Sequence, residues 1–182
     1  ELGEILRADL RLHFSQWPRG WHEQAQWLKL RDQGGWIREV VSHFIFLANR
    51  ILGPVALENC YVQYEDGPEG ALCEQTALAL FSSQTVPLTL AGTSSGHGPD
   101  VVDLTLRGTD GSLRVWDWYR LQSATTEDWV DIFPQKREQL GIDAYAAQLH
   151  QLERMVNGDR HTIASFDEAF RVQELVESLL SG

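Results

Sequence analysis

The stretch "GGWIREVVSHFIFLANRILG", Gly34 to Gly53, predicts a helix that packs on a hydrophobic core. The paired glycines before it and the Gly-Pro pair after it mark its beginning and its end. Glu39 and His43 stand one turn apart on this helix, away from its apolar side. At about 100° per residue, that apolar side is formed by Ile37, Val41, Phe44, Ala48 and Ile51.

The segments on either side of this helix read mostly as strands. Residues 123–141 read as irregular, and helices are expected at 143–156 and 165–180, the second beginning with a capping box of Ser165 and Glu168. This order predicts an α+β fold, a mostly antiparallel open sheet of about six strands covered on one face by helices. The expected strands are residues 6–14, 55–64, 71–82, 86–90, 100–108 and 112–122.

The composition supports one domain, residues 1–182, with a single substantial core. The net charge of −11 repels nucleic acid and anionic membrane surfaces, so neither is expected as a partner. The chain has no apolar run of the roughly 18 residues that span a bilayer and no signal-peptide pattern, which predicts a cytoplasmic protein. Because it begins with Glu and enters a strand almost at once, we expect a fragment of a longer protein with a segment upstream.

Glu39 and His43 are the first candidates for chemistry. A carboxylate four residues before an imidazole on a helix can hydrogen-bond to it and fix its tautomer, which suits a general acid–base role. A solvated helix face with one weak ion pair, worth about 0.3 kcal/mol, explains the same pattern. The residues alone leave both interpretations open.

The loop "WPRGWHEQAQWLKLRDQ", residues 17–33, interleaves aromatic and basic side chains. Aromatic platforms with cations between them suit a sugar or a carboxylate, although tryptophans that pack on the sheet beside solvated cations give the same pattern. The glycine-rich "GTSSGHG", residues 92–98, lacks the spacing of a phosphate-binding loop and reads as a flexible hairpin loop. Two cysteines and scattered histidines form no metal-ligand spacing, so no metal site is expected. The loop residues concerned are Trp17, Arg19, Trp21, His22, Trp27, Lys29 and Arg31.

Three parts of the chain carry a family resemblance. They are "LGEILRADLRLHF", the double glycine followed by acid-x-x-x-His on a helix, and the closing "HTIASFDEAFRVQELVESLLSG". Together they resemble the C-terminal domain of the Gfo/Idh/MocA oxidoreductases, the family of glucose-fructose oxidoreductase and inositol dehydrogenase. The resemblance implies a dihydrodipicolinate reductase-like open sheet.

The resemblance also implies a two-domain enzyme. In this family an N-terminal Rossmann domain binds NAD or NADP and ends in a Glu-Lys-Pro motif with a catalytic lysine. Neither feature occurs in these 182 residues, whose only lysines are Lys29 and Lys136. A cofactor is therefore expected in the parent protein and none on this fragment, which should not turn over by itself.

Site residues follow from the same resemblance. His43 matches the family's catalytic histidine, which helps to move the hydroxyl proton of the substrate. Glu39 falls where the family usually carries Asp, and Phe46 stands where many members carry a second Asp. Lys29 and Arg31 match the basic stretch before the double glycine. The expected site is therefore catalytic His43 and Glu39, with Trp27, Lys29, Arg31 and Arg38 as substrate-binding residues.

The expected function is substrate binding and oligomerisation within an NAD(P)-dependent oxidoreductase that acts on a sugar, a polyol or a related hydroxy compound. Two alternatives stay open: a non-catalytic binding or assembly domain, and a small self-sufficient lyase or isomerase. The expected partners are a small-molecule substrate, the missing Rossmann domain and at least one further copy of the chain. A homodimer or larger assembly is expected because one hairpin has apolar side chains on both faces, namely Val102, Leu104, Leu106, Val115, Trp116 and Trp118.

Overall fold

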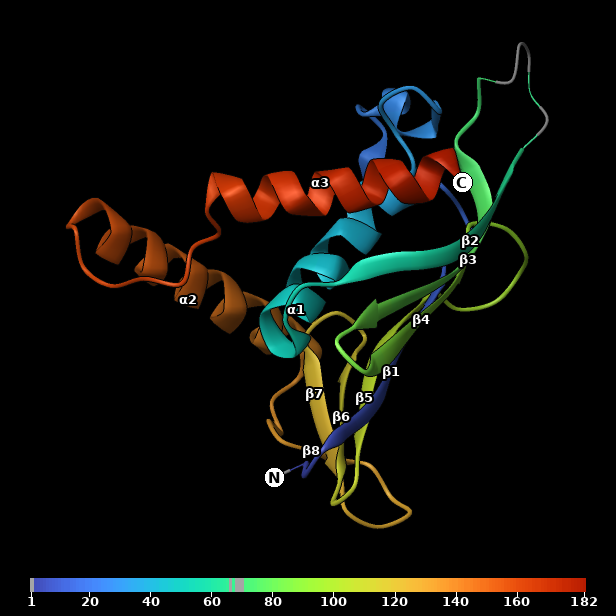
Figure 1. The fold of residues 1–182 in the computed structure, drawn as a ribbon. Coiled ribbons are helices and arrows are strands. Elements are labelled where there is room, and N and C mark those ends of the chain that lie inside the picture. The colour runs from blue at the N-terminus through green and yellow to red at the C-terminus, as the bar shows by residue number, and fades with distance from the viewer. Residues whose placement is uncertain (1, 66, 68–70) are drawn as a thin grey trace.

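Eight strands form one sheet in the computed structural model, which describes residues 2–65, 67 and 71–182 (Figure 1). The order across the sheet is β2-β3-β4-β1-β5-β6-β7-β8. β1 and β4 run parallel, and all other neighbouring strands are antiparallel, so the expected mostly antiparallel α+β fold is confirmed. The strands are β1 (Ile5–His13), β2 (Ala56–Tyr64), β3 (Glu74–Ser83), β4 (Val86–Thr93), β5 (Val101–Gly108), β6 (Ser112–Trp116), β7 (Arg120–Ala124) and β8 (Val130–Asp131).

Helices α1 (Ser42–Leu52) and α3 (Phe166–Ser181) lie against one face of this sheet, as expected, while α2 (Arg137–Val156) stands away from it (Figure 1). A π-helical turn, η3 (Ile37–Val41), leads directly into α1. The loop after β1 contains two short 3-10 turns, η1 (Gly20–His22) and η2 (Gln26–Lys29). The core between the two layers is built from side chains of β1, β3, β4, β5, α1 and α3.

The expected count of about six strands was too low for two local reasons. Residues 112–122 form two strands instead of one, because Asp117 and Trp118 adopt φ values of 47° and 69° and turn the chain between β6 and β7. The two-residue β8 is too short to show an alternating pattern, yet Val130 pairs with Ser123. Helix α2 begins at Arg137, within the segment expected to be irregular.

The double glycine permits a close approach where the chain enters the first helix. Gly35 has a φ of +98°, and a Cβ on it would collide with the carboxylate of Glu74. A Cβ on Gly34 would collide with the main chain of the preceding loop. The indole N–H of Trp36 donates to the main-chain oxygen of Glu74 at 2.9 Å. The amide of Ile37 donates to the side-chain Oε1 of Glu74 at 2.6 Å. These contacts anchor the beginning of the helix to β3.

The π turn also changes which helix residues face the core. It holds one residue more than an α turn, so the helix after it is rotated relative to the expected wheel. Ile45 is consequently buried, whereas Ile51, expected on the apolar side, is 43% exposed. The other four residues of the expected apolar side are buried.

The β5–β6 hairpin is apolar on one face and mixed on the other, where Trp116 pairs with Asp103. Its residues Val102, Leu104 and Leu106 are buried on the side of the helices. On the opposite side Asp103 is buried, where it accepts hydrogen bonds from Arg11 at 2.7 Å and from Thr105 at 2.7 Å. This open face, away from the helices, is mixed here because alternate residues of β5 are polar while Trp116 of β6 lies beside them.

The open face is more apolar at the other end of the sheet. Leu78 and Leu80 of β3 are 50% and 42% exposed, and Tyr61 of β2 pairs with Leu78 in the ladder. Side chains of directly paired residues share one face of a sheet, so Tyr61 and Leu78 lie together there. We call Tyr61, Leu78 and Leu80 the β2–β3 patch.

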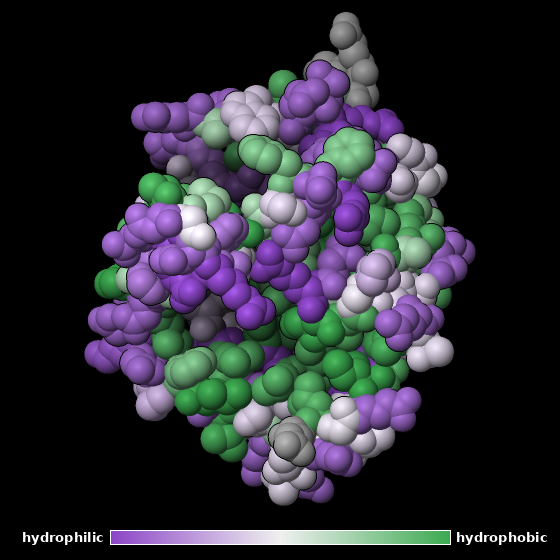
Figure 2. Space-filling model, turned by 60° about the vertical axis from the view of Figure 1, so that its left-hand side comes forward, coloured by the Kyte–Doolittle hydropathy of each residue, from purple (hydrophilic) through white to green (hydrophobic). Residues whose placement is uncertain are grey.

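Helix α2 carries a second uncovered apolar surface. Leu140 is the only buried residue of this helix. Figure 2 brings the α2 side of the molecule forward and shows apolar side chains gathered in the lower half of that face. The stripe of α2 is formed by Ile142, Tyr145, Leu149, Leu152, Met155 and Val156, each at least 39% exposed.

Candidate functional site

Glu39 and His43 both line a cavity of about 350 Å³ beside the first helix. Glu39 is half-buried in η3 and His43 is exposed in the first turn of α1. A hydrogen bond between them, which the four-residue spacing on a helix would allow, is not found among the described residues. The reason is the π turn, in which the amide of Ser42 donates to the oxygen of Ile37, five residues earlier. This wider turn removes the direct stacking of side chains four residues apart.

The ionisable partner of Glu39 is instead His22, from the loop after β1. The two are 3.9 Å apart, measured from Nε2 of His22 to Oε1 of Glu39. His22 is buried and packs on Trp21, with ring centroids 3.7 Å apart. Burial lowers the pKa of His22, the nearby Arg19 lowers it further, and Glu39 opposes both effects. Both ring nitrogens are buried, and neither has a hydrogen bond within the described residues.

The cavity is assembled from four separate parts of the chain. They are the loop after β1, the η3–α1 helix, the turn between β6 and β7, and the beginning of α2. The sequence patterns indicate the loop and the helix but not the other two parts, because only the sheet brings those near His43. The positive φ of the β6–β7 turn is not visible in an alternating pattern. The lining residues are Arg19, Trp21, Glu39, Val40, His43, Trp118, Tyr119 and Arg137.

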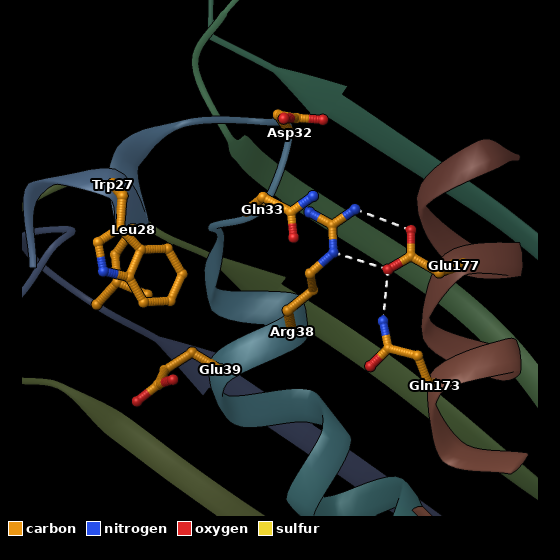
Figure 3. A pocket seen from close by; sticks show the side chains of 8 residues that line it. All are labelled: Trp27, Leu28, Asp32, Gln33, Arg38, Glu39, Gln173 and Glu177. Carbon is orange, nitrogen blue, oxygen red and sulfur yellow. Dashed lines mark hydrogen bonds and ion pairs between the residues drawn. The ribbon is translucent and has the colours of Figure 1, made fainter. Parts of the chain in front are cut away.

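A second cavity, of about 720 Å³, lies on the other side of Glu39 (Figure 3). Arg38 points across it to α3, where its Nε and one terminal nitrogen donate to the two carboxylate oxygens of Glu177 at 2.7 and 2.8 Å. Arg38 also donates to the main-chain oxygens of Arg31 and Gly34, at 2.8 and 2.9 Å. Glu39 points away from this ion pair in Figure 3. Hydrogen bonding to Glu177 raises the pKa of Arg38, and the same contact lowers the pKa of Glu177.

The structure brings together some of the expected substrate-binding residues and separates others. Trp27 and Arg38 line the larger cavity with Glu39. Lys29 is exposed in η2 and lines neither cavity. Arg31 lies over the ring of Tyr64, with its Cζ 3.6 Å from the ring centroid. The binding roles of these four residues stay predictions.

Residues 2–65, 67 and 71–182 contain no group of three or more His, Cys, Asp or Glu side chains placed to hold a metal ion. Within the same residues, no helix has the length and apolar character that crossing a bilayer requires.

Solved oxidoreductase structures share this fold. An oxidoreductase from Agrobacterium radiobacter, solved with NAD+, L-tartaric acid and magnesium, is 19% identical with a TM-score of 0.69, and the match covers 100% of this chain and 56% of that chain. A dehydrogenase from Clostridium difficile is 13% identical with a TM-score of 0.74, over 100% of this chain and 55% of that one. A levoglucosan dehydrogenase, solved with NADH and levoglucosan, is 15% identical with a TM-score of 0.74. That match covers 99% of this chain and 57% of the dehydrogenase chain.

These matches confirm the fold that the family resemblance implied. The chain spans just over half the length of the solved structures that it resembles. No protein-family model matches the sequence, and no curated protein sequence matches it.

Proposed function

We propose that this chain is the substrate-binding and oligomerisation domain of an NAD(P)-dependent oxidoreductase of the Gfo/Idh/MocA family that acts on a sugar, a polyol or a related hydroxy compound. The observation that carries the proposal is the cavity that Glu39 and His43 line together. Its aromatic walls and few convergent polar groups are typical of a small-molecule site. The shared fold of an oxidoreductase and a levoglucosan dehydrogenase, both solved with nicotinamide cofactors, supports the reaction class.

The nicotinamide cofactor does not fit this chain alone. The 182 residues contain no Gly-x-Gly-x-x-Gly sequence, and the described sheet has one parallel strand pair instead of the parallel sheet of a dinucleotide-binding domain. In the proposal, a domain outside this chain holds NAD(P) and closes over the cavity. The bound NAD(P) would supply the hydride acceptor.

The residues of this chain then bind the substrate and move its proton. His43 is exposed in the cavity wall, where its imidazole accepts the proton of the hydroxyl group that is oxidised. Glu39 accepts a hydrogen bond from a neighbouring hydroxyl, and the nearby His22 limits where the Glu39 carboxylate can lie. Trp21 and Trp118 exclude water from one side of the reacting carbon.

The oligomerisation part of the proposal rests on the β2–β3 patch. Its three large apolar side chains lie on the open face of the sheet, which the helices do not cover. A second copy of the chain packing on this face would remove them from water. The cytoplasmic location expected from the sequence stays a prediction.

Steady-state kinetics of the full-length parent protein test the function. NAD+ and NADP+ are each supplied with a panel of sugars, polyols and sugar acids, and NAD(P)H formation is followed. We expect turnover that requires both a hydroxy compound and a nucleotide. Turnover of a substrate by the 182-residue chain with no nucleotide added would instead favour a self-sufficient lyase or isomerase. A parent sequence without a dinucleotide-binding motif would contradict the proposal.

A further inference from the structure

Arg19 is a cation without an anionic partner in the wall of the cavity that His43 lines. Its guanidinium is half-buried, and within the described residues it has no hydrogen bond and no ion pair. Its Nε is fully buried and has no partner. Burial lowers the pKa of Arg19, although Glu39 and Asp100 oppose this shift from a distance.

Four aromatic rings fix the position of this guanidinium. Its Cζ lies 4.6 Å from the ring centroid of Trp21, 4.8 Å from that of Trp118, and 5.4 Å from those of Phe14 and Trp17. Cation–π contacts stabilise an arginine in place but leave its N–H groups unsatisfied. A buried donor without an acceptor costs about 1–3 kcal/mol, more when it is charged. The arrangement therefore holds a preformed donor group at the cavity.

A second arginine contributes to the same cavity from another element. Arg137, at the beginning of α2, donates from Nε to Oδ1 of Asp117 at 3.0 Å. That single contact leaves its two terminal nitrogens without a partner among the described residues. Among the described residues that line this cavity Glu39 is the one carboxylate, and it lies beside His22. Cations thus outnumber anions in the lining, although the whole chain has a net charge of −11.

We propose that this cavity binds the anionic group, a carboxylate or a phosphate, of a hydroxylated substrate, with Arg19 and Arg137 as its ligands. This inference rests on the proposed function, because it assigns the substrate class to the same site. Arginine is suited to the role because its planar fork of donors matches both oxyanions. The long-range field of an acidic protein repels anions, so recognition here depends on short-range contacts with these two side chains.

The anion belongs to the substrate and not to the nucleotide. In dinucleotide-binding folds the pyrophosphate lies at a helix N-terminus within the Rossmann domain. The cavity here is lined by His43, so its occupant has to include the atoms whose proton His43 accepts. Its volume of about 350 Å³ is sufficient for a single sugar acid or sugar phosphate.

Calorimetric titration of the 182-residue chain tests the inference without any nucleotide. The probes are D-glucuronate, D-glucose 6-phosphate and uncharged D-glucose, and NADH is titrated separately. We expect at least one charged sugar to bind at least tenfold more tightly than glucose. Arg19→Met, which keeps most of the packing against the aromatic rings, should weaken that binding at least tenfold. Arg160→Gln makes the same change in charge at an exposed residue outside the cavity and should leave the affinity unchanged.

Arg137→Gln provides a second variant that does not disturb the buried rings, and it should weaken binding at least threefold. Equal affinity for charged and uncharged sugars, or binding of NADH alone in an Arg19-dependent manner, would overturn the inference. Arg19-dependent binding of a charged sugar combined with no NAD(P)-dependent turnover in the parent protein would support the anion site and contradict the proposed function. The two proposals can therefore fail separately.

Discussion

The carboxylate of Glu39 lies 3.9 Å from Nε2 of His22, a buried imidazole from the loop after β1. His22 thereby connects the loop to the helix that carries His43. Within the described residues neither ring nitrogen of His22 has a hydrogen bond, so this imidazole is held by packing against Trp17 and Trp21. The helix that carries His43 and the aromatic loop therefore meet at this contact.

Replacing His22 tests how this imidazole affects the stability of the protein and the dependence of stability on pH. His22→Leu removes two buried nitrogens that lack partners, so we expect the free energy of unfolding at pH 7 to change by less than about 1 kcal/mol. Because the pKa of His22 is lowered in the folded state, the wild type loses stability as the pH falls below the ordinary value of 6.5. The variant should lose less stability in acid. Chemical denaturation at a series of pH values measures both effects. An equal loss of stability in acid in the two proteins would contradict the lowered pKa of His22.

His43 should be required for turnover in the parent protein. His43→Gln removes the proton acceptor, and we expect kcat to fall roughly 10²–10⁴-fold, with a smaller change in KM. His161→Gln is the matched control, because this histidine is exposed and has no hydrogen bond in the described residues. Initial rates over a range of substrate concentrations measure the effect. Wild-type kcat in the His43 variant would favour the non-catalytic interpretation of the helix.

Glu74 makes stability depend on pH in the opposite sense to an ordinary surface carboxylate. Burial raises its pKa from 4.5 to about 7, despite the hydrogen bond from Ile37. The folded protein therefore holds a proton that the unfolded chain releases, so stability decreases as the pH rises from about 4.5 to about 7. At about 1.4 kcal/mol per pKa unit, the total loss is on the order of 3 kcal/mol.

Glu74→Gln keeps an acceptor for the Ile37 amide and removes the titration. We expect the stability difference, variant minus wild type, to grow with pH between about 4.5 and 7 and then to level off. Taking the difference cancels the contribution of His22, which both proteins share. Urea unfolding in matched buffers provides the measurement, and a difference independent of pH would rule out Glu74 as its source.

The bidentate contact of Arg38 with Glu177 can be tested by a double-mutant cycle. Arg38→Met and Glu177→Gln should show a coupling energy of about 1 kcal/mol, because the pair is only partly buried. Glu174→Gln, at an exposed position of the same helix, should have no coupling with Arg38. If Arg38 also binds substrate, Arg38→Met should raise KM in the parent protein while Glu177→Gln should not. If the KM of Arg38→Met equals the KM of Glu177→Gln, the role of Arg38 is purely structural.

Gly35 should tolerate no side chain. Gly35→Ala places a Cβ against the Glu74 carboxylate at a φ of +98°, and we expect a loss of roughly 1–3 kcal/mol in the free energy of unfolding. Gly20→Ala is the control, since nothing lies within 4 Å of the Cβ that it would add. Thermal unfolding of the two variants gives the comparison, and similar melting temperatures would contradict the close packing at Gly35.

Much of the fold followed from local patterns. The alternating strands, the capping box of Ser165 and Glu168, and the double glycine are local features, so the sequence predicted them well. The β6–β7 turn and the short β8 were missed because neither leaves a periodic signal. The rotation caused by the π turn was also missed. A π turn, whose hydrogen bond spans five residues, has the same sequence pattern as an ordinary helical turn. Ile51 was misplaced for that reason.

The sequence by itself determined the α+β class, the helix that carries Glu39 and His43, and the loop that supplies Arg19 and the tryptophans, because each is encoded in neighbouring residues. Only the tertiary structure decided which of these side chains meet. The antiparallel neighbours β1, β5, β6 and β7 and the turn at Asp117 bring distant segments to one cavity, where Glu39 faces His22 and Arg19 has no ion pair among the described residues. Such contacts depend on strand order and on backbone angles, and no pattern of nearby residues contains that information.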